Sequence, residues 1–292
     1  MNDKSFLMKF FYMLGMERIS WACRRLYCPV SKSALVLEVG SGGSPYFRSN
    51  VLIDAYEETR ERHWVPFIKD RPSVLGVGEA LPFKDKTFDF VIASHVLEHS
   101  SDPEHFLHEL QRVAKAGYIE TPGAFMERIN PYWDHRSEVS VFDDVLIVKK
   151  KSSWIMDEDL VELYEQKIKE VIAGEIIPRN PFVFHTRFFW AGQIPFQVIN
   201  QEVDATWLAP TIIANTPPPF SLRAFIGRVG LYIARLIFSQ RKRNALLDLI
   251  SLLACPSCGN SPLQLENEGI TCPSCRKRYE VRDGMPIMYP FQ

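Results

Sequence analysis

A short apolar run that passes into glycines constrains the fold of this 292-residue chain more than any other feature of the sequence. Residues Leu35–Val39 are followed at once by the glycine-rich turn Gly40–Gly43. An apolar run of this length, bounded by a turn, indicates a strand that is buried on both faces, as in parallel sheets. Glycines allow the backbone to pass close to a ligand. The turn is therefore a candidate cofactor loop, and we expect it to open a helix.

Further apolar runs of strand length follow along the chain. They are residues 51–54, 73–77, 88–93 and 117–120. Between the last two, Asp102 and Pro103 predict the start of a helix whose apolar residues repeat at helical spacing from Phe106 to Ala114. Strands that alternate with helices predict an α/β fold with a Rossmann-like, doubly wound sheet, which binds ligands beyond the carboxyl ends of its strands.

Changes in pattern divide the chain into four segments. They are an N-terminal helical extension (1–33), a main domain (34–216), a linker with a basic amphipathic helix (217–251) and a small C-terminal domain (252–292). Lys9 interrupts the first apolar stretch, and no cleavage site follows, which argues against a signal peptide. We expect two antiparallel strands, near 196–203 and 206–215, to close the sheet of the main domain. The prolines at 217–219 mark the domain linker.

The charge and the cysteines narrow the class of protein. A formal net charge of -1 gives no general reason to expect a nucleic-acid partner. A nucleic-acid partner remains an alternative. No run approaches the ~18 apolar residues that a membrane span needs. Four of the six cysteines form two Cys-x-x-Cys pairs. Such pairs favour metal in a reducing compartment over disulfides, so we expect a cytoplasmic protein.

These paired cysteines predict a structural zinc site in the C-terminal domain. The four ligands are Cys255, Cys258, Cys272 and Cys275. Four thiolates close a tetrahedral shell around zinc and leave no position open for chemistry. A domain of this size has little hydrophobic core of its own, so a metal would stabilise it strongly.

Several segments accompany the glycine-rich turn in a fixed order. They are Asp54 at the end of the second strand, Gly78–Phe83, Phe88–His99 and 107–122. A dinucleotide-binding domain would need a third glycine where this chain has Pro45. In this order the segments closely resemble the class I methyltransferases of the ubiquinone and menaquinone biosynthesis type, over about residues 34–122.

The resemblance implies S-adenosylmethionine as cofactor and assigns roles to nine residues. The loop around the methionine end would contain Glu38, Gly40, Ser41 and Gly42. Asp54 would bind the ribose, and Gly78 and Glu79 would lie near the adenine, because Val77 stands where relatives often have an acid. Ser94 and His95 would face the methyl group.

Methyl transfer from a sulfonium depends on alignment, and a base is needed only when the acceptor arrives protonated. His135, which follows the fifth strand, is the first candidate base, and His185 is the second. The alternative for each is a histidine that only hydrogen-bonds a loop. His95, Glu98 and His99 could also hold a divalent ion, although the same string occurs in relatives without metal.

The C-terminal segment 252–288 resembles the small zinc-ribbon protein that activates methyltransferases of tRNA and translation factors. The resemblance implies that the ribbon binds and stabilises the catalytic domain in cis. In the alternative, the basic side chains of Arg276, Lys277 and Arg278 grip the substrate.

Three function classes follow from these patterns. The first is a methyltransferase for a small-molecule, sugar, glycan or lipid-linked acceptor, with peripheral membrane contact through residues 221–253 as one way to reach it. The second is a methyltransferase for tRNA or protein that uses the ribbon to bind its substrate. The third is a non-catalytic adaptor with the same fold. The sequence does not identify the acceptor.

Overall fold

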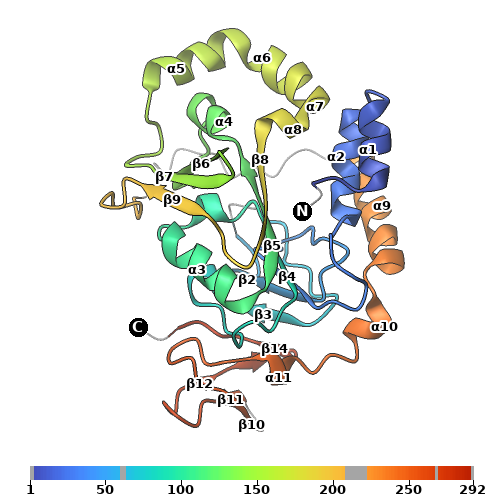
Figure 1. The fold of residues 1–292 in the computed structure, drawn as a ribbon, viewed down its shortest axis with the longest axis vertical. Coiled ribbons are helices and arrows are strands. Elements are labelled where there is room, and N and C mark those ends of the chain that lie inside the picture. The colour runs from blue at the N-terminus through green and yellow to red at the C-terminus, as the bar shows by residue number, and fades with distance from the viewer. Residues whose placement is uncertain (1–2, 60–63, 208–221, 267–268, 291–292) are drawn as a thin grey trace.

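The computed structural model describes residues 3–59, 64–207, 222–266 and 269–290. Its centre is a six-stranded sheet with the order β3-β2-β1-β4-β5-β8 (Figure 1). The strands are β1 (Val36–Val39), β2 (Val51–Asp54), β3 (Ser73–Leu75), β4 (Phe90–Ser94), β5 (Ala116–Pro122) and β8 (His185–Ala191). The first five are parallel, and β8 is antiparallel to β5. The predicted Rossmann-like sheet is confirmed, and the carboxyl ends of its parallel strands share one edge.

The predicted helix after the fourth strand is also confirmed, as α3 (Pro103–Val113). The Asp102 side chain caps it by accepting a hydrogen bond from the backbone N–H of His105 at 3.1 Å. The helix buries Phe106, Leu107 and Leu110 against one face of the sheet. The other face is covered by Tyr46 and by the chain near Cys28.

One local prediction is wrong, because the glycine-rich turn opens no helix. Residues 40–50 run through turns directly into β2. Eleven residues separate β1 from β2. Within them, the backbone N–H of Tyr46 donates a hydrogen bond to the Glu38 carboxylate at 2.9 Å. The Ser49 hydroxyl donates to the same oxygen at 2.5 Å. The Glu38 side chain thus accepts a backbone hydrogen bond in a segment where a helix would have supplied the hydrogen bonds itself.

The prediction for residues 196–203 is also wrong. These residues contain β9 (Phe196–Ile199), which pairs in parallel with β7 (Val145–Lys150) in a separate sheet of order β6-β7-β9. β6 (Ser137–Phe142) completes that sheet. The strand that pairs with β5 at this side of the main sheet is β8, not β9. Of the strand predicted at 206–215, Thr206 and Trp207 are described and lie outside any strand, and 208–215 lie outside the described residues.

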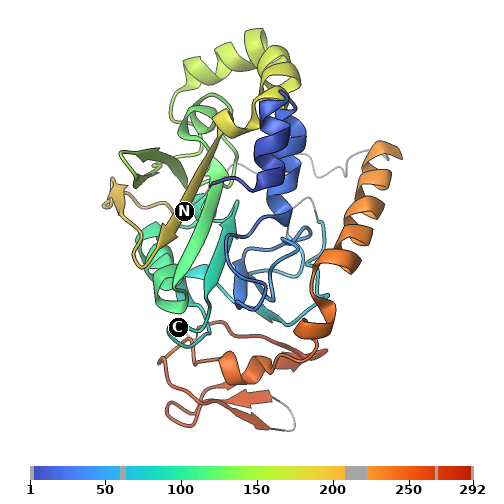
Figure 2. The same cartoon turned by 45° about the vertical axis from the view of Figure 1, so that its right-hand side comes forward.

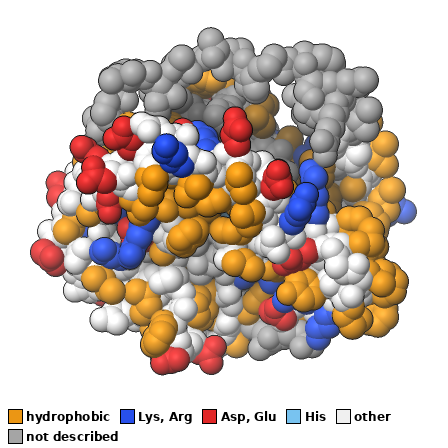
Figure 3. Space-filling view, turned by 90° about the horizontal axis from the view of Figure 1, so that it is seen from above, with side chains coloured by type: hydrophobic (Ala, Val, Ile, Leu, Met, Phe, Trp, Pro, Cys, Tyr) orange, Lys and Arg blue, Asp and Glu red, His pale blue; other side chains and the backbone are white. Residues whose placement is uncertain are grey.

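Helices surround the carboxyl end of the sheet (Figures 1 and 2). The N-terminal segment forms α1 (Phe6–Met13), α2 (Glu17–Cys23) and a 3-10 turn at Arg24–Leu26. Beyond β5 lie α4 (Ala124–Ile129), α5 (Glu158–Leu163), α6 (Lys169–Val171), α7 (Ile177–Arg179) and α8 (Pro181–Phe184), with π-helical turns at Tyr164–Ile168 and Ile172–Ile176. Figure 3, which looks onto this end, shows hydrophobic side chains gathered between charged ones. The exposed apolar residues of this region include Leu163, Val171, Ile176 and Val183.

The amphipathic helix predicted from Ser221 is α9 (Leu222–Phe238), which Figure 2 shows beside the main domain. Arg235 pairs with Asp70 at 3.9 Å, and the Phe238 ring lies 6.3 Å from that of Phe47. Two short helices follow, α10 (Arg241–Asn244) and α11 (Leu249–Leu252). Among the described residues, no helix combines the length and apolar character that crossing a membrane requires.

The C-terminal ribbon shares its hydrophobic core with the main domain. Its strands are β10 (Gln264–Glu266), β11 (Gly269–Thr271), β12 (Arg278–Tyr279), β13 (Val281–Arg282) and β14 (Met285–Pro286). Leu253 and Met288 are fully buried in the cluster that also contains Phe83 of the main domain. The N–H of Met288 donates to the carbonyl of Leu75 in β3 at 2.7 Å. The ribbon therefore covers the exposed edge of the main sheet, where unpaired backbone would otherwise face water.

This shared core predicts that ribbon and main domain unfold together. We expect Leu253→Ala to lower the free energy of unfolding by about 2–5 kcal/mol, the cost of truncating a buried leucine. The control Leu265→Ala, at a side chain that is 63% exposed, should change it by less than about 0.5 kcal/mol. Urea unfolding followed by circular dichroism measures both. Equal stability of the two variants would contradict the shared core.

Candidate functional site

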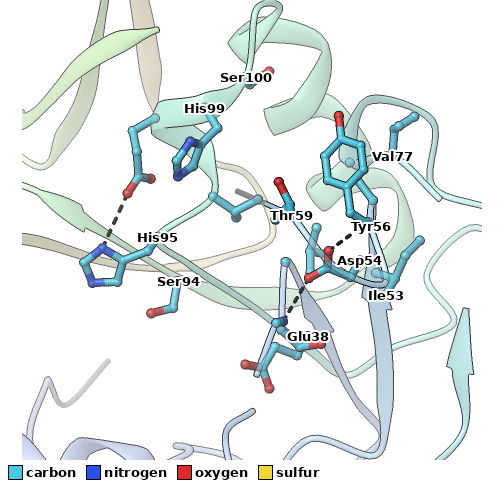
Figure 4. A pocket seen from close by; sticks show the side chains of 18 of the residues that line it. Glu38, Ile53, Asp54, Tyr56, Thr59, Val77, Ser94, His95, His99 and Ser100 are labelled. Carbon is cyan, nitrogen blue, oxygen red and sulfur yellow. Dashed lines mark hydrogen bonds and ion pairs between the residues drawn. The ribbon is translucent and has the colours of Figure 1, made fainter. Parts of the chain in front are cut away.

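A cavity of about 680 Å³ opens at the carboxyl ends of β1, β2 and β4. Figure 4 shows Ser94 and His95 on one side of it and Asp54, Tyr56 and Val77 on the other. All nine predicted cofactor residues line it, namely Glu38, Gly40, Ser41, Gly42, Asp54, Gly78, Glu79, Ser94 and His95. The predicted base His135 lines it as well. His185 does not, and together with His135 it lines a smaller cavity of about 170 Å³.

Backbone conformation explains the glycines of the first loop. Gly40 and Gly42 have φ of +68° and +53°, a region that residues with a Cβ rarely adopt. A Cβ at Gly40 would also lie 2.7 Å from the side chain of Val96. The hydroxyl oxygen of Ser41 in the same loop is buried and has no hydrogen-bond partner among the described residues. The loop therefore passes close to the cavity with a polar atom left for a ligand.

Two carboxylates hold this loop. Asp54, at the end of β2, accepts hydrogen bonds from the N–H of Gly42 at 2.9 Å and of Tyr56 at 3.0 Å. Glu38, at the end of β1, accepts the bonds from Tyr46 and Ser49 described above. Burial raises the pKa of Glu38 to about 7, although those hydrogen bonds and nearby arginines oppose the rise. Glu38 therefore changes charge near neutral pH.

A third carboxylate, Glu120 in β5, organises the opposite wall. It is fully buried and accepts two hydrogen bonds from Arg24, from Nε at 2.9 Å and from the second guanidinium nitrogen at 3.1 Å. The hydroxyl groups of Ser94 and Tyr118 donate to it at 3.0 and 2.5 Å. Burial alone would raise the pKa of Glu120, but His95 and Arg24 hold it well below its usual value. Glu120 was not among the predicted site residues, although an acid at the carboxyl end of a predicted buried strand was an available signal.

His95 lies between two buried carboxylates. Its Nδ1 is 3.4 Å from Glu98, and its Nε2 is 3.4 Å from Glu120. Burial alone would lower the pKa of His95, but the two carboxylates overcome this effect and raise the pKa to about 9. His95 is thus positively charged at neutral pH, which makes it a poor proton acceptor and a poor metal ligand. It has a φ of +57° and precedes the 3-10 turn Leu97–His99, so it does not share a helical face with His99.

The two candidate bases have different surroundings. Nδ1 of His135 lies 2.6 Å from the Glu127 carboxylate, which also binds Lys151 at 2.7 Å. Nδ1 of His185 lies 2.8 Å from the carbonyl of Pro181, and its ring lies 4.6 Å from that of Trp21. Burial lowers the pKa of His185, so its ring is neutral at neutral pH. His185 matches the loop-bonding alternative more closely, because a backbone carbonyl holds it outside the larger cavity.

The four predicted cysteines lie together in the ribbon, with their sulfur atoms within 4.8 Å of one another. The Sγ atoms of Cys255 and Cys275 are 3.7 Å apart, and those of Cys258 and Cys272 are 3.6 Å apart. Tetrahedral zinc with Zn–S bonds of about 2.3 Å requires sulfur atoms about 3.8 Å apart. The cluster therefore has the donors and the spacing of a closed zinc site.

Comparison with known proteins finds two separate matching segments, one in the main domain and one in the C-terminal ribbon. The family model described as "Methyltransferase domain" matches residues 37–119, and the model described as "Trm112p-like protein" matches residues 247–284. Demethylmenaquinone methyltransferase of Streptomyces griseus is 48% identical over 59 residues, which are 20% of this chain and 23% of that protein. An uncharacterized protein of Methanocaldococcus jannaschii is 30% identical over 81 residues, 28% of this chain and 40% of that protein. The matches thus span less than half the length of these relatives.

Solved structures found by comparison include a chain from the complex between the Haloferax volcanii Trm112 methyltransferase activator and a methyltransferase. It is 16% identical, with a TM-score of 0.36, over 64% of this chain and 97% of that chain. An S-adenosylmethionine-dependent methyltransferase from Aquifex aeolicus is 20% identical, with a TM-score of 0.28, over 41% of this chain and 75% of that chain. The two family models and the parallel sheet show that the protein contains a methyltransferase domain and a C-terminal Trm112p-like domain with a four-cysteine cluster.

Proposed function

We propose that the protein is an S-adenosylmethionine-dependent methyltransferase whose ribbon holds a structural zinc ion. The convergence of all nine predicted cofactor residues on one cavity carries this proposal. A cavity of about 680 Å³ lies within the range of small-molecule sites. The buried hydroxyl of Ser41, the positive φ of Gly40 and the carboxylate of Asp54 fit a ligand that has a carboxylate at one end and a ribose in the middle.

Each strand end contributes one part of the binding. The Asp54 carboxylate accepts hydrogen bonds from the ribose hydroxyl groups, and Glu38 attracts the ammonium group of the methionine end. Arg25, which lines the cavity and donates to the carbonyl of Ser44 at 2.5 Å, supplies positive charge for the methionine carboxylate. This charge matters because no helix N-terminus follows the glycine-rich turn. Gly78 and Glu79 lie at the adenine end.

When bound, the cofactor supplies a methyl group on a positively charged sulfur, which already activates the carbon. The chain then has to align an acceptor and exclude water. The smaller cavity, lined by Pro122, Met126, Ile177 and Phe184 together with His135 and His185, supports an acceptor with a small apolar part. We propose a small-molecule or lipid-linked acceptor that enters beside α7 and α8, with His135 near its reacting oxygen.

Exposed apolar residues support a lipid-linked acceptor. On α9 they include Tyr232, Ile233 and Ile237, and the same helix carries Arg223 and Arg228 in the sequence. A basic amphipathic helix binds anionic lipid by combining apolar burial with charge attraction. A tRNA or protein acceptor bound through the ribbon is the second candidate, because Arg276, Lys277 and Arg278 are basic and the ribbon is Trm112p-like.

Binding of labelled S-adenosylmethionine tests the proposed function. In equilibrium dialysis we expect Asp54→Asn to weaken binding about tenfold or more, because a neutral amide replaces the charged acceptor of the ribose hydroxyl groups. The control Glu202→Gln, at an exposed side chain, should bind as the unaltered protein does. If Asp54→Asn binds equally well, the assigned cofactor site is wrong.

The pH dependence of cofactor binding follows from Glu38. Because its pKa is raised to about 7, the side chain is neutral below that pH and charged above it. Its attraction for a ligand ammonium group is therefore lost as the pH falls from 8 to 6, and affinity should fall with it. Titration across this range should show that Glu38→Gln binds weakly at every pH and lacks the change near pH 7. An unchanged transition in that variant would assign it to another group.

Sedimentation with vesicles tests the lipid-linked acceptor. The protein should bind vesicles of phosphatidylglycerol and phosphatidylcholine at low salt and be released as salt rises, because screening weakens the attraction of arginines for anionic lipid. Ile237→Glu should reduce binding, whereas Leu265→Glu on the ribbon should not. No sedimentation at low salt would leave the tRNA or protein acceptor as the better candidate.

A further inference from the structure

A second group of metal-ligating side chains lies in the wall of the cavity. One ring nitrogen of His99, one of His135 and a carboxylate oxygen of Glu98 lie within 4.8 Å of one another. Glu98 and His99 belong to the 3-10 turn after β4, whereas His135 comes from the loop between α4 and β6. All three residues line the cavity of about 680 Å³. The group is distinct from the four cysteines of the ribbon.

Carboxylates stand behind both imidazole rings. Nδ1 of His135 lies 2.6 Å from Glu127, and Nδ1 of His99 lies 3.2 Å from Asp134. Histidines that bind metal usually donate their second ring N–H to a carboxylate or carbonyl, which fixes the orientation of the ring. His135 makes this hydrogen bond to Glu127, whereas His99 contacts Asp134 as an ion pair. Because both Nδ1 atoms face carboxylates, Nε2 is the atom that each ring offers to a ligand. The rings themselves lie 4.8 Å apart, edge to face.

The buried Glu98 carboxylate has the charged ring of His95 as its ion-pair partner at 3.4 Å. Its side chain is only 2% exposed, and neither carboxylate oxygen accepts a hydrogen bond from the described residues. The carboxylate oxygens of Asp134 are also buried without a hydrogen-bond donor among those residues. Glu120 and Glu127 have Arg24 and Lys151 as partners, whereas Glu98 and Asp134 form ion pairs only with histidines in the described part of the chain. A metal ion at this place would add to the charge compensation that the histidines give to these two buried carboxylates, which have no hydrogen-bond donor among the described residues.

We propose that Glu98, His99 and His135 bind a divalent first-row transition metal ion, with zinc as the best fit. Two imidazoles and one carboxylate are a donor set of catalytic zinc sites, and a site for Mg²⁺ or Ca²⁺ would consist of oxygen atoms. Metal–ligand bonds of about 2.0–2.2 Å bring ligand atoms about 3–3.5 Å apart, so the side chains rotate toward one another when the ion binds. His99, 27% exposed, has room for this movement.

Three protein ligands leave at least one coordination position, which faces the cavity. Water or an acceptor oxygen fits this position. His135 then acts as a metal ligand and not as a free base. This role for the ion rests on the proposed function, whereas binding of the ion does not.

Metal content of the full chain tests the proposal. After equilibrium dialysis against micromolar zinc, mass spectrometry should find two zinc ions per unaltered chain, one in the ribbon and one in the cavity. His135→Asn and, separately, His99→Asn should each retain one. The matched control His105→Asn, at an exposed histidine of α3, should retain two. Cys258→Ser should lose only the ribbon ion.

Cobalt distinguishes the two sites spectroscopically. The ribbon should show a thiolate-to-cobalt charge-transfer band, and the cavity site should add visible absorption without such a band. One ion per unaltered chain, or two in a folded His135→Asn variant, would overturn the proposal. Circular dichroism of the variants verifies that they fold. Calorimetry with S-adenosylmethionine measures cofactor binding separately from the zinc count. If the unaltered chain binds the cofactor but holds only one zinc ion, only the metal site is contradicted. If it holds two zinc ions but does not bind the cofactor, only the proposed function is contradicted.

Discussion

The cavity depends on carboxylates buried at the ends of parallel strands, and above all on Glu120. This side chain receives hydrogen bonds from Arg24 of the N-terminal segment and from Ser94 of β4. Tyr118 adds a third, and Arg187 of β8 donates in turn to the Tyr118 hydroxyl at 2.9 Å. One buried charge thereby joins four separate parts of the chain. Removing a partner from such a network would leave a charge uncompensated in the interior, which is strongly destabilising.

The buried carboxylates also explain how the chain forms an ordered loop, and not a helix, after its first strand. Glu38 and Asp54 bind the backbone of the loops that follow β1 and β2, and the N-terminal segment covers the face of the sheet near Cys28. Arg25, at the end of that segment, lines the cavity beside the glycine-rich turn. Its positive charge lies where the N-terminus of a helix would otherwise supply partial positive charge. The N-terminal segment is therefore part of the site, and the ribbon at the other end of the chain completes the core.

Features set by short stretches of sequence could be predicted. The five parallel strands, α3 with its cap at Asp102, the glycine-rich turn and the cysteine cluster all follow from local periodicity, turn residues or motif spacing. Features that depend on contacts between residues far apart in the sequence could not be predicted. Arg24 and Glu120 are 96 residues apart, and β9 pairs in a second sheet with β7, a strand that lies far from it in the sequence. His99 meets His135 only through the loop before β6, so no spacing within one stretch of sequence could indicate that contact.

The proposed activity requires that the cavity at the strand ends binds an adenosyl cofactor. Titration calorimetry of the zinc-loaded full chain with S-adenosylhomocysteine, the demethylated product, tests this most directly because it needs no acceptor. We predict saturable binding of one molecule per chain, with a dissociation constant in the range of about 1 μM to 1 mM, as for typical enzyme ligands. An absence of binding heat across several temperatures, with the protein folded, would contradict the account.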